Sequence, residues 1–152
     1  QHSELGYNYR LSNICAGIGR GQMEVLGDRI SQRRKNNEFY KNIFKDIEGV
    51  TIFSEPNEDY FSNFWLTNII VDPSASGINR EILRLKLLEE DIESRPLWKP
   101  LHLQPIFKES KFFGGSVSET LFNNGLCLPS GSNLTTEEKD RIAECIKLCF
   151  KK

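Results

Sequence analysis

The stretch from Phe64 to Val71, FWLTNIIV, decides the fold. Successive side chains of an extended chain point to opposite faces, and apolar side chains here occupy both faces. One face holds Trp65, Thr67, Ile69 and Val71, and the other holds Phe64, Leu66 and Ile70. Because a surface strand is apolar on one face only, this stretch is predicted to be a central strand covered on both sides. Asp72-Pro73 ends it.

A long helix is predicted upstream, from about Ser12 to Ile47, because apolar residues recur there at spacings of three and four. Gly49 lies just beyond its end, where helices often stop. The first half of this helix contains Gly17, Gly19, Gly21 and Gly27. Each such glycine costs a helix interior up to about 1 kcal/mol relative to alanine. We therefore expect a second helix or chain to approach this half closely.

Shorter elements are predicted on either side of the central strand. They are a weak strand at Val50–Phe53, a helix from Asn79 to Glu90, a strand at Ile92–Leu97, a short helix near Val117–Asn124 and a final helix after Thr135. The helix that Asn79 caps is expected to bury Ile82, Leu85 and Leu88. Asp91 stands where a helix-ending glycine is usual, and Asp tolerates the left-handed conformation.

The final helix begins with a capping box, in which Thr135 and Glu138 stand three residues apart. The chain from Trp98 to Ser132 is otherwise predicted to be mostly loop, and loops this long in compact domains are usually functional. Helices and strands in this order indicate an α+β fold, in which helices cover a small sheet.

Composition limits the possible partners. The chain has 152 residues, with 20 Lys+Arg against 21 Asp+Glu. This balance argues against a nucleic-acid surface, which carries a basic excess, and no apolar run approaches the roughly 20 residues that span a bilayer. The cysteines are Cys15, Cys127, Cys145 and Cys149. They form no C-x-x-C pair, so we expect small buried residues in a reducing cytoplasm and no metal site.

Two segments carry more functional side chains than packing requires. In Gly6–Asn13, Asn8 and Arg10 are donors suited to phosphate oxygens and precede a helix start, although a capped helix entrance would explain them equally. In Ser94–His102, cations, an indole and an imidazole suit a planar ring that bears phosphates. A loop histidine such as His102 is, however, more often structural. The basic stretch Arg29–Lys35 is expected to be a solvated helix face, with a polyanion site as the alternative.

No phosphate-binding glycine loop and no nucleophile motif occurs in the chain, so a shared part of a site is the natural inference. Three motifs in order, GYNYRLSN (6–13), IESRPLWKPLH (92–102) and LCLPSGSNLT (126–135), resemble the C-terminal third of the DegT/StrS-type nucleotide-sugar aminotransferases, of pyridoxal-phosphate fold type I. The resemblance implies that residues 1–152 are the small C-terminal domain, of α+β fold with a mainly antiparallel sheet. Residues 1–13 would then join the large domain that binds the cofactor.

The resemblance also implies an activity and a set of site residues. The whole enzyme would transfer an amino group from glutamate to a nucleotide-linked 4-keto-6-deoxy sugar, as a cytoplasmic homodimer that uses pyridoxal 5'-phosphate. The RPLWKPLH form is most similar to the branch that acts on UDP-4-keto-6-deoxy-N-acetylhexosamines of the bacillosamine type. Asn8 would bind the cofactor phosphate of the partner subunit, while Arg10, Arg95, Trp98 and His102 would contact the substrate.

The family's cofactor-binding lysine lies upstream of GYNYR, and none of the six residues before Tyr7 is a lysine. We therefore expect this chain to contain no catalytic residue, to be inactive alone, and to bind pyridoxal phosphate weakly or not at all. The alternative is a non-catalytic module derived from the family, which dimerises or binds nucleotide sugars.

Overall fold

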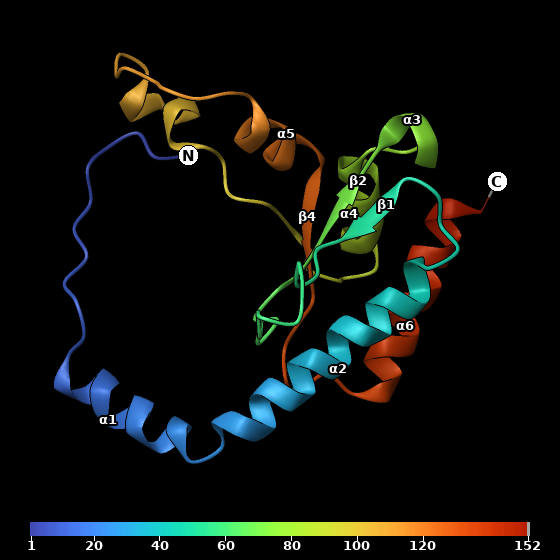
Figure 1. Ribbon diagram of the computed structural model, residues 1–152, viewed down its shortest axis with the longest axis horizontal. Coiled ribbons are helices and arrows are strands. Elements are labelled where there is room, and N and C mark those ends of the chain that lie inside the picture. The colour runs from blue at the N-terminus through green and yellow to red at the C-terminus, as the bar shows by residue number, and fades with distance from the viewer. Residues whose placement is uncertain (152) are drawn as a thin grey trace.

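The computed structural model describes residues 1–151 (Figure 1). The helices are α1 (Asn13–Met23), α2 (Leu26–Phe44), α3 (Pro73–Ser76), α4 (Arg80–Glu89), α5 (Val117–Asn124) and α6 (Thr136–Phe150), with short 3-10 helices at Leu101–Leu103 and Pro105–Phe107. The strands are β1 (Val50–Ile52), β2 (Thr67–Val71), β3 (Arg95–Pro96) and β4 (Gly125–Leu128). The predicted α+β class is confirmed. None of the helices in this part of the chain is long and apolar enough to cross a bilayer.

The sheet is antiparallel throughout, in the order β1-β2-β4-β3, so β2 is a central strand as predicted. Its register places Val71 opposite Val50 of β1 and Asn68 opposite Cys127 of β4. The strand is shorter than expected, because Phe64 adopts a left-handed backbone conformation with φ of 44° and cannot extend the ladder. Trp65 therefore lies outside the strand and is exposed.

The core lies between one face of the sheet and three helices. Alternation along β2 places Ile69 and Val71 on the same face, and both are fully buried. They belong to one cluster with Tyr40 and Phe44 of α2, Leu83 and Leu87 of α4, Leu126 and Leu128 of β4, and Ile142, Cys145 and Ile146 of α6. Helices α2, α4 and α6 thus cover this face, and α2 and α6 run side by side in Figure 1.

The buried stripe predicted for α4 is wrong. Leu83 and Leu87 are fully buried, whereas Ile82, Leu85 and Leu88 are about half exposed. The helix has apolar residues on two adjoining faces, and the side that packs against β4 and α6 determines which of them is covered.

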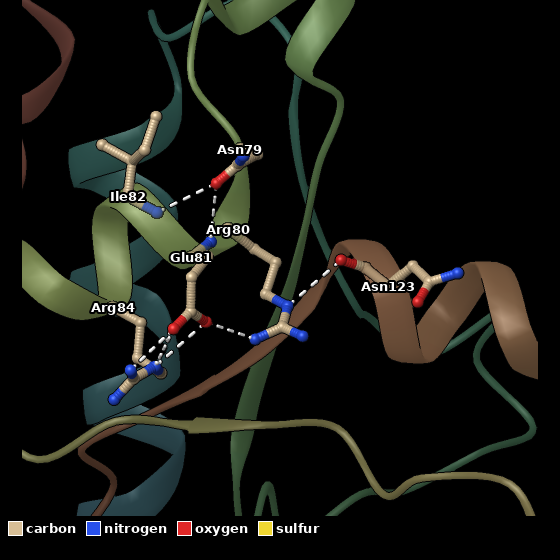
Figure 2. Close-up of polar contacts among 6 residues, drawn as sticks. All are labelled: Asn79, Arg80, Glu81, Ile82, Arg84 and Asn123. Carbon is tan, nitrogen blue, oxygen red and sulfur yellow. Dashed lines mark hydrogen bonds and ion pairs between the residues drawn. The ribbon is translucent and has the colours of Figure 1, made fainter. Parts of the chain in front are cut away.

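The start of α4 is fixed as predicted. Asn79 Oδ1 accepts the backbone N–H groups of Glu81 and Ile82 at 3.0 and 2.9 Å (Figure 2). Arg80 Nε also donates to the backbone carbonyl of Asn123 at 3.1 Å, and its Nη1 lies 2.7 Å from Glu81. These contacts tie the first turn of α4 to the end of α5.

The single long helix that the spacing predicted is two helices. It breaks at Glu24 and Val25, whose N–H groups bond to carbonyls three residues back, on Gly21 and Gln22. Helix α1 buries no residue and extends away from the sheet (Figure 1). A Cβ added at Gly17, Gly19 or Gly21 would meet no atom within 4 Å in the described chain. The close partner expected for these glycines stays a prediction.

The loop predicted from Trp98 to Ser132 is also interrupted. The helix expected at Val117–Asn124 is present, but β4 follows it directly and every residue of β4 is buried. The strand expected at Ile92–Leu97 is reduced to the two residues of β3. The Thr135 capping box is confirmed, and so is the left-handed Asp91, with φ of 55°.

Gly49 is required by close packing as well as by its backbone angle. Its φ is 78°, and an added Cβ would lie 2.5 Å from Ser76 N. Gly77 has a φ of 79° but open space around it. We expect Gly77→Ala to lower the free energy of unfolding by about 1–2 kcal/mol, the cost of a left-handed residue, and Gly49→Ala to lower it by about 1–3 kcal/mol more. Urea denaturation measures both, and equal losses would contradict the packing argument.

Candidate functional site

The Ser94–His102 loop borders a pocket at the end of the sheet. β3 is an edge strand, a position that suits Pro96 because proline has no N–H to donate to a neighbour. Leu97 N–H donates to the Gly125 carbonyl at 3.3 Å, and the chain then leaves the sheet at Trp98. The pocket measures about 400 Å³ and is lined by residues 65–66, 93–96, 98 and 127–130. That volume lies within the range of small-molecule sites, about 300–1,000 Å³.

Two indole rings dominate this pocket. Trp98 follows β3 and Trp65 precedes β2, and their ring centroids lie 6.3 Å apart with planes inclined by 37°. Both side chains are largely in solvent, with exposed fractions of 60% for Trp65 and 68% for Trp98. They are the only tryptophans in the sequence. The structure therefore brings together the predicted Trp98 and a second indole that the sequence did not indicate.

Side chains on one face of α2 hold the segment after β4, which forms one wall of the pocket. Arg33 Nη1 donates to the carbonyls of Trp65 and, at 3.0 Å, Ser130. Asn36 Nδ2 donates to the Gly131 carbonyl at 2.8 Å, and Tyr40 Oη donates to the Pro129 carbonyl at 2.7 Å. Burial raises the pKa of Tyr40, so its hydroxyl stays protonated as a donor. Helix α2 thus holds the wall through its backbone carbonyls.

Ser130 joins this wall to the sheet. It is buried, and its Oγ accepts the Thr67 N–H and donates to the Leu128 carbonyl, both at 2.8 Å. The hydroxyl therefore bridges the start of β2 and the end of β4.

The charges at the pocket are already paired. Glu93 Oε1 accepts hydrogen bonds from Arg95 at Nε (2.7 Å) and Nη2 (2.5 Å), and both residues line the pocket and are exposed. Exposed ion pairs contribute little to stability, about 0–1 kcal/mol. The pairing matters more for binding, because it leaves the pocket without a net positive charge.

His102 lies on the far side of its loop and does not line this pocket. Its Nε2 is 3.0 Å from Glu119 Oε1 on α5, and its ring stacks on Phe112 with centroids 3.8 Å apart. Its side chain is mostly covered. These contacts fasten the loop to α5, and contact between His102 and the substrate stays a prediction.

Asn8 and Arg10 lie on the extended segment before α1, and both are exposed. Asn8 Oδ1 accepts the Arg10 N–H at 2.8 Å, which closes a small turn, and Arg10 has a left-handed φ of 67°. This turn uses the acceptor of the Asn8 amide and leaves its NH₂ group free to donate. The segment is fastened at its start, where the His2 N–H donates to Gln104 Oε1 at 3.0 Å.

The basic stretch Arg29–Lys35 is not simply a solvated face. Besides Arg33, Arg34 pairs with Glu55 at 2.8 Å and lies over the Phe61 ring at 4.5 Å. The hydrogen bond from Arg34 lowers the pKa of Glu55. Both guanidinium groups therefore anchor the loop before β2, which leaves little of the stretch for a polyanion.

The cysteines remain free thiols. Cys127 and Cys145 are buried as expected, but Cys15 is exposed on α1, contrary to the prediction. Burial raises the pKa of Cys149 to about 11, so this thiol is a poor nucleophile at neutral pH. Residues 1–151 hold no group of three or more metal-ligating side chains.

A larger hollow of about 570 Å³ lies between α4 and α6, away from every predicted site residue. Its rim mixes carboxylates with Lys86 and Arg141. It is lined by no aromatic side chain on which a planar ring could stack, so the tryptophan pocket is the better candidate site.

Comparison with known proteins gives the family. A model of the DegT/DnrJ/EryC1/StrS aminotransferase family matches residues 1–147. The chain belongs to this family. EpsN of Bacillus subtilis (strain 168), whose name assigns it to the pyridoxal phosphate-dependent aminotransferases, is 47% identical over 99% of this chain and 39% of its own length. GDP-perosamine synthase of Escherichia coli O157:H7 is 35% identical over 95% of this chain and 38% of its own.

Solved structures of aminotransferases share the fold. A family aminotransferase from Brucella abortus aligns with 99% of this chain and 41% of its own, with a TM-score of 0.76 and 26% identity. PseC of Helicobacter pylori aligns with a TM-score of 0.77 at 22% identity, over 99% of this chain and 40% of its own. The chain thus spans about two fifths of the length of the relatives it matches.

Sequence reasoning missed Trp65, Arg33 and Ser130 as parts of the pocket. Trp65 was assigned to a buried strand face, and Arg33 to a charged surface. Ser130 stood in the third family motif, but nothing in that motif indicates which backbone groups its hydroxyl joins.

Arg33 is expected to stabilise the pocket wall through its two carbonyl contacts. We expect Arg33→Met to lower the free energy of unfolding by about 1–2 kcal/mol, less than a fully buried charged hydrogen bond because Arg33 is partly exposed. Arg29→Met, one turn earlier on an exposed arginine, serves as the matched control and should change it by less than about 0.5 kcal/mol. Urea denaturation compares the two, and equal losses would mean that the carbonyl contacts contribute nothing.

Proposed function

We propose that this chain is the small C-terminal domain of a pyridoxal-phosphate-dependent aminotransferase, which transfers an amino group from glutamate to a nucleotide-linked 4-keto-6-deoxy sugar. The family match over residues 1–147 is the observation that carries the proposal. The similarity to GDP-perosamine synthase and to a UDP-4-amino-4-deoxy-L-arabinose–oxoglutarate aminotransferase of Shewanella sediminis supports a nucleotide-sugar substrate. Of the possible sugars, we propose a UDP-linked N-acetylhexosamine of the bacillosamine type.

The exposed N-terminal segment would contribute to a cofactor site completed by the rest of the protein. The free NH₂ group of Asn8 suits a phosphate oxygen of pyridoxal phosphate, because its acceptor is already used by the Arg10 N–H. When bound, the cofactor supplies the electron sink for amino transfer. Arg10, Arg95, Trp98 and His102 would contact the nucleotide sugar. The bond between His102 and Glu119 would also hold the loop that carries Trp98 in place.

A homodimer and a large domain would cover the surfaces that this chain leaves open. The first 26 residues expose many large apolar side chains, among them Tyr7, Leu11, Ile14 and Ile18. Their glycine-rich helix has no neighbour in the described chain, so another domain or subunit could approach its backbone closely. We propose that residues 1–13 join the large domain and that α1 packs near the dimer interface.

Amino transfer by a longer protein containing this chain tests the proposal directly. We expect that protein to bind pyridoxal phosphate, and glutamate to change the visible spectrum of the bound cofactor. A UDP-linked 4-keto sugar should then restore the original spectrum. The 152-residue chain alone should give neither change, because the lysine that holds the cofactor is expected outside it. Activity of this chain by itself would refute the assignment to one domain of a divided site.

Two substitutions in the longer protein should separate cofactor binding from substrate binding. Asn8→Ala is expected to weaken cofactor affinity by about 1.5–3 kcal/mol, the contribution of a hydrogen bond to a charged group. Trp98→Ala should instead raise KM for the nucleotide sugar more than KM for glutamate. Each variant controls for the other, in cofactor titration and in steady-state kinetics. If Trp98→Ala raised both KM values equally, the loop would not bind the nucleotide sugar.

A further inference from the structure

The two tryptophans form a pocket of fixed geometry without filling it. Their planes, inclined by 37° at 6.3 Å, leave them neither stacked nor edge-to-face, the two arrangements that aromatic pairs prefer. More than half of each side chain remains in solvent. Cys127, Leu128 and Pro129 give the pocket an apolar floor. A flat ring placed here would gain contact with both indoles.

The backbone of Trp65 is fixed by hydrogen bonds, although its side chain is exposed. Its N–H donates to Asn63 Oδ1 at 3.0 Å, and its carbonyl accepts from Arg33. Both of its backbone polar groups are therefore fixed, although it lies in a loop. On the other side, Trp98 lies between Pro96 and Pro100, whose rings restrict the backbone on either side of it. Such preorganised walls reduce the entropy lost on binding.

The charges that line the pocket favour an uncharged part of a ligand. The one guanidinium that lines the pocket, on Arg95, is paired with Glu93, so the two charges largely cancel. A phosphate would find no unpaired cation in the lining.

We infer that the pocket between Trp65 and Trp98 binds the base of a nucleotide by stacking, and that Trp65 is a binding residue together with Trp98. The inference rests on the proposed function, which supplies a nucleotide-linked substrate, and it adds the position of the base and the force that holds it. Stacking on aromatic side chains depends little on ionic strength. The nucleoside alone should therefore bind nearly as well as the nucleoside diphosphate.

Intrinsic fluorescence tests this in the 152-residue chain, because both of its tryptophans lie in the pocket. We expect uridine and UDP to quench the emission, with dissociation constants within about fivefold of each other, the most that an exposed ion pair contributes. Added salt should change neither constant appreciably. Inorganic pyrophosphate and N-acetylglucosamine should not quench.

Variants then test each wall. Trp65→Phe leaves Trp98 as the only reporter, and Trp98→Phe leaves Trp65, so uridine should quench both variants. By calorimetry, Trp65→Ala should bind uridine roughly 5- to 150-fold more weakly, the range for one base stacked on one aromatic side chain. Phe113→Ala removes an aromatic ring that is still more exposed and lies outside the pocket, and this variant should bind uridine normally.

The inference would be overturned if uridine failed to quench, if UDP bound only at low salt, or if Trp65→Ala bound uridine as the unaltered chain does. Quenching by N-acetylglucosamine alone would overturn it too, since the pocket would then hold the sugar. The amino-transfer assay is independent of all these measurements. Transfer without uridine binding would refute only the position of the base, and uridine binding without transfer would refute only the proposed function.

Discussion

Three side chains of α2 donate hydrogen bonds to three successive carbonyl groups after β4, and the arrangement at this end of the sheet depends on them. Tyr40 bonds to Pro129, Arg33 to Ser130 and Asn36 to Gly131. Positions 33, 36 and 40 fall on one face of a helix, so α2 is aligned along the turn that leaves the sheet. Arg33 also reaches the carbonyl of Trp65, which brings the loop before β2 to the same place.

This constraint makes α2 an unusual core helix. Asn36 and Asn37 are as buried as Tyr40 and Phe44. A buried amide is costly unless it is hydrogen-bonded, and Asn36 meets that requirement through the Gly131 carbonyl. The polar side chains of α2 therefore fix the loop after β4 by hydrogen bonds, whereas apolar side chains could only have packed against it. The loop they fix carries one wall of the pocket, so the rigidity of the core extends to the candidate site.

The molecule combines this rigid end with an open one. The sheet, its three covering helices and the tryptophan pocket form a continuous packed unit, whereas α1 and the segment before it contribute nothing to the core. The family relatives are more than twice as long as this chain. A domain that shares a site with the rest of a larger protein would have this division: a self-supporting body that positions one part of the ligand, and an apolar arm that reaches its neighbours.

Features that depend on local pattern could be predicted from the residues alone. Apolar residues on both faces of the segment around Ile69 predicted the central strand. Asn79 and Thr135 marked two helix starts, and the three motifs indicated the family. Tertiary contacts decided the rest. The exposed side of α4 and the four buried residues of β4 depend on what packs against them, which short periodic patterns do not encode. The pocket is the clearest case. Trp65 and Trp98 are 33 positions apart in the sequence, and they meet because only β4 lies between β2 and β3 in the sheet. Arg33 also fixes the backbone carbonyl of Trp65.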